Sequence, residues 1–193
     1  FFFILSRRKI SLKRRQLIMT DMNQPRLSGS VKLIKNTVYT LLGVQLLFGL
    51  IFGLRFYFSD HHETLEDSLF QGFYQSISAV TNSGFDVTGN SAAPYSQDYV
   101  FITFLIFLIM LGGIGFPVIM EVKEWLFYKR TKHGIPFRFS LFSKLAISIY
   151  LILFLSGTLA IYLLERNHLL SNMPEIQKWF TAMFYSSTTR NAG

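Results

Sequence analysis

Three apolar blocks, each long enough to cross a membrane as a helix, constrain this chain more than any other feature. They cover about residues 37–58, 99–120 and 141–164. A helix rises 1.5 Å per residue, so about 20 apolar residues span a hydrocarbon core of ~30 Å. Lipid offers no partner to backbone amides and carbonyls, whereas a helix pairs them within its own segment. The sequence therefore predicts an all-α polytopic membrane protein.

The residue types within these blocks argue against a membrane-embedded enzyme. Such an enzyme needs a nucleophile or a bound metal at depth, and the three blocks contain no His, Asp or Glu. The chain also has no Cys, so it offers no disulfide and no thiolate metal site. We therefore predict a protein that is not an enzyme and that needs no cofactor.

The net charge of +8 is unevenly distributed, and its distribution predicts which loops face the cytoplasm. Nine Lys and Arg residues precede the first block, and six lie in the segment 121–144. The segment 59–98 has no Lys or Arg and holds six Asp and Glu residues. Because short basic loops stay in the cytoplasm, we expect the N-terminal segment and 121–144 inside, and 59–98 and 165–193 outside. The basic N-terminus then anchors to anionic lipid rather than to nucleic acid.

A Ser/Thr/Gly motif follows the first and the third block. It reads Ser-Ala-Val-Thr-Asn-Ser-Gly at 78–84 and Ser-Thr-Thr-Arg-Asn-Ala-Gly at 187–193, an offset of 193 − 84 = 109 residues. A short amphipathic helical pattern precedes each copy, at 64–80 and 175–187. One copy alone is equally compatible with a surface helix. The repetition between spanning blocks predicts two re-entrant pore loops.

The ends of these short helices suit the binding of a cation. Thr64 can cap the first helix, with Glu66 and Asp67 in its first turn, where the helix dipole favours anions. Its C-terminal end then carries partial negative charge towards the bilayer interior. Irregular backbone survives at that depth only if it packs in protein or lines water, and Gly84 is suited to the positive φ that aims carbonyls one way.

The sequence therefore predicts a selectivity filter in which backbone and hydroxyl oxygens bind a hard monovalent cation, K⁺ or Na⁺. The predicted filter residues are Val80, Thr81, Asn82, Ser83, Gly84, Thr188, Thr189, Asn191, Ala192 and Gly193.

Three further features allow a functional and a structural interpretation. Arg190 lies within the second motif, and because charges at depth are normally paired, we expect it to brace the filter with Asp86 of the neighbouring loop. A second group, within the second block, either forms a hinge or packs closely against another helix; it consists of Gly112, Gly113, Gly115 and Pro117. Arg55, at the outer end of the first block, is expected to extend to the membrane interface.

At these residues the chain resembles the Trk/Ktr/HKT superfamily of potassium transporters, most closely the membrane subunit of bacterial Ktr systems. The resemblance rests on Thr-Asn-Ser-Gly-Phe-Asp at 81–86, Gly-Gly-Ile-Gly-Phe-Pro at 112–117 and Thr-Thr-Arg-Asn-Ala-Gly at 188–193. The basic stretch 9–15 and the link 26–29 are similar as well. The combination is specific, although each motif alone is weak.

The family has four helix–pore loop–helix repeats of the potassium-channel type in one polypeptide, around a pseudo-fourfold pore. The resemblance implies that residues 1–35 are the cytoplasmic tail of a first repeat with a basic link. Residues 36–130 would form the second repeat, and 131–193 a third repeat that stops at its filter glycine. Gly84 and Gly193 match the family's filter glycines. The chain would then be an internal piece of a longer protein, without the gating segment of the third repeat and without the fourth repeat.

The resemblance also implies the function. It indicates potassium uptake across the cell membrane, here the bacterial inner membrane, driven by the membrane potential. It further implies a homodimer and a cytoplasmic nucleotide-binding regulatory ring that meets the stretches near 9–15 and 129–132. Two alternatives stay open: a pore for another small cation, Na⁺ or NH₄⁺, and a membrane scaffold or receptor that transports nothing.

Overall fold

The computed structural model describes residues 30–59, 64–86, 92–128 and 137–191, and from 30 to 34 it describes only the backbone. Regular structure in this part of the chain is entirely helical, which agrees with the predicted all-α class. In chain order the elements are α3 (Ser30–Phe58), α4 (Leu65–Thr81), the 3₁₀ turn η1 (Ala93–Tyr95), α5 (Tyr99–Gly113), α6 (Phe116–Tyr128), α7 (Leu141–Glu165) and α8 (Glu175–Asn191). The predicted contact stretches near 9–15 and 129–132, and the filter residues Ala192 and Gly193, lie outside the described residues.

Among the described residues, two helices are long and apolar enough to cross a membrane alone. They cover Lys35–Phe58 in α3 and Leu141–Glu165 in α7, in agreement with the first and third apolar blocks. Leucines along both helices are exposed, among them Leu46 and Leu155. Apolar surface of this extent on a helix is typical of contact with a membrane.

The second apolar block is not one straight helix. It is divided into α5 and α6, whose axes differ by 112°. The chain turns at Gly115, whose φ of 98° favours glycine, and Pro117 follows where it can begin the next helix. The 15 residues of α5 rise about 22 Å, less than the ~30 Å that a straight span requires.

The core between α3 and α5 is aromatic. Phe52 and Phe56 of α3 and Phe101 of α5 are fully buried, and Tyr95 of η1 is nearly so. The ring centroids of Phe52 and Phe101 are 4.8 Å apart in an edge-to-face arrangement, and those of Phe56 and Tyr95 are 4.5 Å apart and stacked. Both arrangements are favourable for aromatic pairs, and they pack the N-terminal half of α5 against α3.

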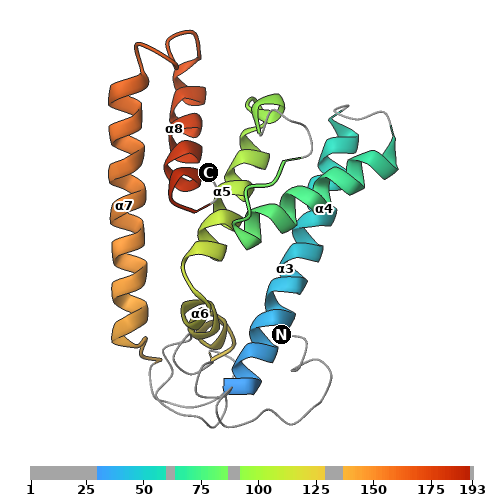
Figure 1. Cartoon of the computed structure of the whole chain (residues 1–193), viewed down its shortest axis with the longest axis vertical. Helices are drawn as coiled ribbons and strands as arrows, with labels where there is room; N and C mark the ends of the chain where they lie inside the picture. Colours follow the sequence, from blue (N-terminus) through green and yellow to red (C-terminus); the bar gives the residue numbers. More distant parts are fainter. Residues whose placement is uncertain (1–29, 60–63, 87–91, 129–136, 192–193) are drawn as a thin grey trace.

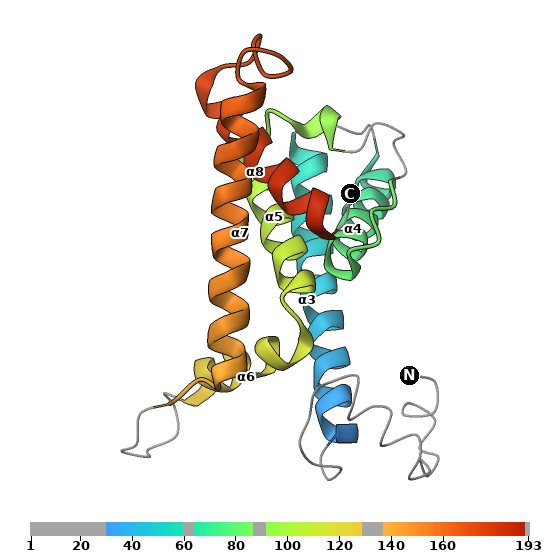
Figure 2. The same cartoon turned by 60° about the vertical axis from the view of Figure 1, so that its left-hand side comes forward.

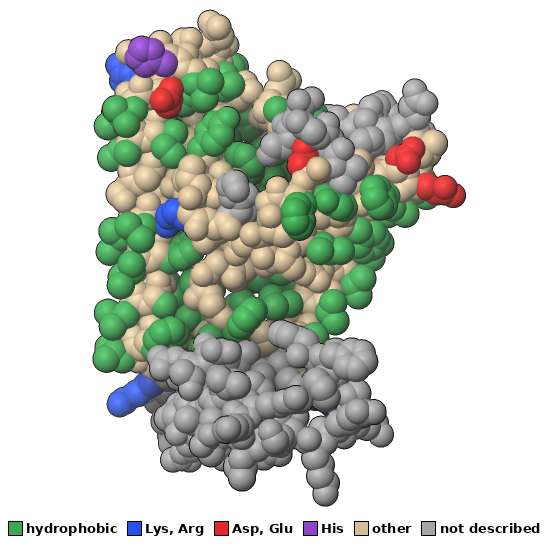
Figure 3. Space-filling model, in the orientation of Figure 1, with side chains coloured by type: hydrophobic (Ala, Val, Ile, Leu, Met, Phe, Trp, Pro, Cys, Tyr) green, Lys and Arg blue, Asp and Glu red, His purple; other side chains and the backbone are tan. Residues whose placement is uncertain are grey.

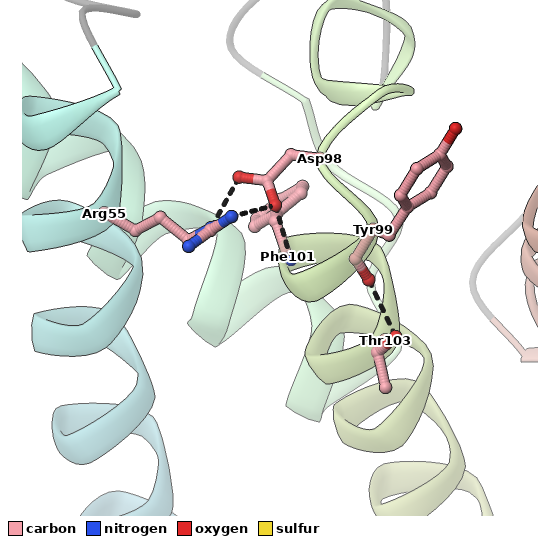
Figure 4. Close-up of polar contacts among 5 residues, drawn as sticks. All are labelled: Arg55, Asp98, Tyr99, Phe101 and Thr103. Carbon is pink, nitrogen blue, oxygen red and sulfur yellow. Dashed lines mark hydrogen bonds and ion pairs between the residues drawn. The ribbon is translucent and has the colours of Figure 1, made fainter. Parts of the chain in front are cut away.

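An ion pair joins the C-terminal end of α3 to the N-terminal end of α5 (Figure 4). The Arg55 guanidinium donates through Nε and Nη2 to the Asp98 carboxylate, at 2.6 and 2.7 Å. Asp98 also accepts the backbone N–H of Phe101 at 3.0 Å and so caps α5. The expectation that Arg55 extends to the membrane interface named no partner for it, whereas the structure gives it a bidentate one in a nearly buried carboxylate next to α5.

Where the helix α4 crosses α3 at Gly72, the two backbones lie in direct contact. A Cβ on Gly72 would lie less than 3 Å from the backbone of Gly53. Ser76 of α4 donates its hydroxyl hydrogen to the carbonyl of Gln45 on α3 at 3.0 Å. Glycine at the crossing therefore allows α4 to lie directly on the longer helix, as small residues do between membrane helices.

Both short helices run back along the long ones to about their middle (Figures 1 and 2). The helix α4 packs on α3, α8 packs on α7, and α5 lies between the two short helices in contact with both. On the face drawn in Figure 3 the acidic side chains gather in the upper half, where α4 and α8 begin. The two short helices thus direct their C-terminal ends towards the middle of the molecule.

Candidate functional site: two loops at the middle of the helices

The first motif, residues 78–84, covers the last turn of α4 and the loop that follows it. Asn82 adopts the left-handed conformation, with φ 51° and ψ 37°. Its N–H donates to the carbonyl of Ala79 at 3.2 Å, and the N–H of Ser83 donates to the carbonyl of Ser78 at 3.1 Å. This pair of bonds is a Schellman motif. Asn is the residue other than Gly that most readily adopts this conformation, so the amide residue itself ends the helix.

The loop then turns at Gly84, whose φ is 67°. This confirms the predicted positive φ at that residue. The Ser78 hydroxyl donates to the carbonyl of Phe85 at 2.8 Å and ties the far end of the loop to the helix. In the described part of the chain no hydrogen bond is made to the carbonyls of Thr81, Asn82, Ser83 and Gly84. These oxygens are therefore available to a ligand.

Helix α4 itself forms as predicted at its other end. The hydroxyl oxygen of Thr64 accepts the backbone N–H of Asp67 at 3.2 Å, which confirms Thr64 as the N-cap. Glu66 and Asp67 lie in the first turn, so the acidic end faces away from the loop and the negative end of the dipole faces it.

The second motif remains helical as far as the structure describes it. Thr188, Thr189, Arg190 and Asn191 lie in the last turn of α8, not in an extended loop. The hydroxyls of both threonines donate to the carbonyl of Tyr185, at 3.3 and 2.8 Å. Glycine commonly ends a helix one position after its cap; the glycine of this motif is Gly193, beyond the described residues. The roles of these residues in a filter remain predictions.

A small cavity joins the two motifs. Its volume is about 50 Å³, enough for roughly one or two water molecules. Gly84 and Asp86 line it from the first loop, and Thr188 lines it from α8. Ile109 of α5 closes it on a third side. Residues 104 positions apart in the chain (188 − 84) therefore border one small space.

Arg190 braces α8 against α7. Its Nε donates to the carbonyl of Ser186 at 2.9 Å, and its Nη1 donates to the carbonyl of Tyr150 at 3.3 Å. The guanidinium carbon lies 4.8 Å from the centre of the Tyr150 ring, a cation–π distance. The expected pairing with Asp86 is not formed: the helical backbone at Arg190 directs the side chain to α7. Its Nη2 is buried and has no partner among the described residues.

The first turn of α8, at the end of the helix away from Arg190, is fixed by bonds to Glu175. Lys178 pairs with Glu175 at 2.7 Å, and the Tyr162 hydroxyl donates to the same carboxylate at 2.9 Å. These bonds, with that to Lys178 the stronger, lower the pKa of Glu175 below its usual value. Tyr162 also stacks on Trp179, with ring centroids 4.1 Å apart.

The end of α5 supports both motifs. With its amide oriented to satisfy its neighbours, Asn82 accepts the N–H of Gly113 at 2.9 Å and donates to the carbonyl of Ile109 at 3.2 Å. A Cβ on Gly113 would lie 2.6 Å from Nδ2 of Asn191. Asn191 also donates to the hydroxyl of Tyr150 on α7. The sequence contained a signal for this arrangement, because the two asparagines occupy the same place in the two motifs.

Comparison with known proteins agrees with this architecture. A sequence model of the TrkH family, described as "Cation transport protein", matches residues 3–193. The chain is 40% identical, over its full length, to the Ktr system potassium uptake protein D of Bacillus subtilis. It is 28% identical over 96% of its length to the Ktr system potassium uptake protein B of that organism. It is also 26% identical over its full length to the potassium/sodium uptake protein NtpJ of Enterococcus hirae.

The chain spans about two fifths of the length of these relatives: 42%, 40% and 40%, respectively. The relatives therefore contain more than the helices described above, and their activities belong to the longer proteins.

Proposed function

Because the chain belongs to the TrkH family of cation transport proteins, we propose that it is the middle part of a potassium uptake protein and carries two strands of its selectivity filter. The observation that carries this proposal is the cavity bordered by both motifs. Gly84 and Thr188 line it, and Gly84 is the last of four consecutive residues whose carbonyls accept no hydrogen bond from the described residues. Backbone oxygens in such a place can replace the water of a monovalent cation.

The energetics of the site favour a cation over an anion. The C-terminal end of α4 carries roughly half a negative charge, and it adjoins the open carbonyls after Thr81. An anion site would instead present helix N-termini and their N–H groups. A membrane potential of 100 mV contributes about 2.3 kcal/mol per charge to inward flow, so no chemical step is required.

Potassium is the cation that we propose. Two relatives are named potassium uptake proteins, and glycine at both filter positions fits the potassium-preferring members of the family. Sodium is the second candidate, because a further relative is named a potassium/sodium uptake protein. The proposed ligands are the oxygens of residues 80–84, and those of 188, 189 and 191–193.

The same proposal includes the membrane orientation, the repeats and the assembly of the longer protein. The segment 59–98 and the start of α8 face outside, and 121–144 faces the cytoplasm. Residues 36–130 form one helix–pore loop–helix repeat and 131–193 form most of the next, within a pseudo-fourfold pore. The longer protein assembles as a homodimer on a cytoplasmic nucleotide-binding ring.

The test is rubidium or potassium uptake by the full-length protein with Gly84→Ser. The serine adds a side chain at a positive φ, so the loop shifts and its carbonyls no longer fit K⁺. We expect the preference for K⁺ over Na⁺ to fall by about tenfold, or ~1.4 kcal/mol, with the protein still present in the membrane. Gly43→Ala is the control, because nothing lies within 4 Å of a Cβ there.

Two outcomes would contradict the proposal. A full-length protein without cation uptake would be a scaffold or a receptor. A Gly84→Ser variant with unchanged ion preference would remove the first loop from the filter.

A further inference from the structure

The C-terminal ends of the two short helices α4 and α8 meet α5 at consecutive residues, Gly112 and Gly113. Asn82 and Asn191 hold equivalent places in the two motifs, 109 residues apart (191 − 82). Both amide side chains contact Gly113: Asn82 accepts its N–H, and Asn191 lies where its Cβ would be. One residue of α5 therefore touches both copies of the motif.

Gly112 is next to the backbone of the first loop. A Cβ there would lie less than 3 Å from the carbonyl oxygen of Val80. This carbonyl belongs to the last turn of α4 and immediately precedes the open carbonyls of the loop. Because the neighbour is backbone and not the end of a flexible side chain, it cannot move aside without moving the loop.

We infer that Gly112 and Gly113 are positioning residues that hold both pore loops at the depth and angle their carbonyls require. They would set the ion preference without touching the ion. This inference rests on the proposed function.

Close packing alone does not account for this arrangement. Small residues commonly occur where two membrane helices meet, and Gly72 on Gly53 is an example in this chain. Gly112 and Gly113 instead adjoin the irregular end of one pore helix and the last residue of the other. Loops that must be accurate to within about 0.5 Å are best held by a rigid element, and α5 supplies one.

The experiment is a competition assay of K⁺ and Na⁺ uptake by the full-length protein, with Gly112→Ala and Gly113→Ala measured separately. Alanine favours helix more than glycine does, so any loss comes from the displaced neighbour. We expect Gly112→Ala to reduce the K⁺ preference at least fivefold and to raise the KM for K⁺. The maximal rate should fall less than the preference, because the remaining pore is unchanged.

Gly157→Ala is the matched control. A Cβ on Gly157 would lie 2.6 Å from the Ser186 hydroxyl, behind the pore helix α8 and away from its last residue. We expect this variant to alter stability or expression while the ratio of K⁺ to Na⁺ uptake stays at the wild-type value. A shift in ion ratio at Gly157 equal to that at Gly112 would overturn the inference, because general loosening would then explain both.

A second substitution that should rescue Gly113→Ala tests this glycine independently of Gly112. The three atoms nearest to a Cβ on Gly113 all belong to the Asn191 side chain, so shortening that side chain should relieve the crowding. We expect Gly113→Ala combined with Asn191→Ser to prefer K⁺ no less than Asn191→Ser alone, which makes the two changes non-additive. If Gly112→Ala does not reach the membrane, this pair carries the test, and strictly additive effects would overturn the inference.

The failure of this inference is distinguishable from the failure of the proposed function. Loss of K⁺ preference in Gly84→Ser but normal preference in both alanine variants would overturn only the positioning role. Absence of cation uptake in the wild-type protein would overturn both.

Discussion

Arg55 and Asp98 form a charge pair that links two helices far apart in the sequence. The Asp98 carboxylate is only 7% exposed, and it accepts bonds from Arg55 and from the first turn of α5. Its position depends on a side chain 43 residues earlier in the chain. The pair holds the C-terminal end of α3 to the N-terminal end of α5.

Arg55→Met should therefore destabilise the protein. It leaves a nearly buried carboxylate without its cation, which costs about 1–3 kcal/mol after allowance for the partly exposed arginine. The measurement is thermal unfolding of the full-length protein in detergent. The double variant with Asp98→Asn keeps an oxygen for the cap and removes the orphaned charge. We expect it to be more stable than Arg55→Met; equal or lower stability would argue against the pair.

The roles of single residues could be predicted where they depend only on neighbours in the sequence. The cap at Thr64 and the positive φ at Gly84 depend on a few neighbouring residues, and both predictions were confirmed. The partner of Arg55 was missed because it depends on how α3 and α5 pack. The partner of Arg190 was predicted wrongly, because the contact with Tyr150 depends on the backbone of α8 remaining helical there.

At the scale of the elements, the crossing of α4 on α3 determines where the first loop lies. Its backbone-to-backbone contact at Gly72 and Gly53 leaves no room for a methyl group. The depth at which α4 ends follows from this contact, and with it the position of the open carbonyls.

Gly72→Ala should consequently lower the stability of the repeat by about 1–3 kcal/mol, the usual cost of overpacking. The expected signs are a lower thermal midpoint and reduced yield of the full-length protein in the membrane. Gly43→Ala on the lipid-facing part of α3 serves for comparison, and it should be neutral or slightly stabilising. A Gly72→Ala protein as stable as Gly43→Ala would show that the crossing is not tight.

Helices could be predicted from the periodicity of apolar residues. The length of an apolar block was a poorer guide. The helix expected at 64–80 is observed at Leu65–Thr81, because its cap and its Schellman end are encoded nearby. The second apolar block gave no sign in its hydrophobicity that it turns by 112°; its glycines and proline indicated a bend without giving its size. Helix α8 extends past the predicted end at 187 to Asn191, since Ser, Thr and Asn can continue a helix when nothing interrupts it.

At the scale of the whole molecule, the prediction that remains to be tested is the orientation in the membrane. Gln97 and Glu124 are both exposed and lie in segments that we propose to be on opposite sides. The chain has no Cys of its own, so single cysteines introduced here report accessibility clearly.

In a full-length protein without other reactive cysteines, Gln97→Cys should react with a membrane-impermeant maleimide added to intact cells. Glu124→Cys should react only after the membrane is opened. The basic residues of the segment 121–144 are the physical reason for this orientation. The reverse labelling pattern would place the filter entrance on the cytoplasmic side.

The ends of α4 and α8 dock on adjacent residues of α5, and this has a geometrical consequence. Successive residues of an α-helix point in directions about 100° apart. Neighbours that dock on Gly112 and on Gly113 can therefore approach the helix from sides that differ by slightly more than a right angle.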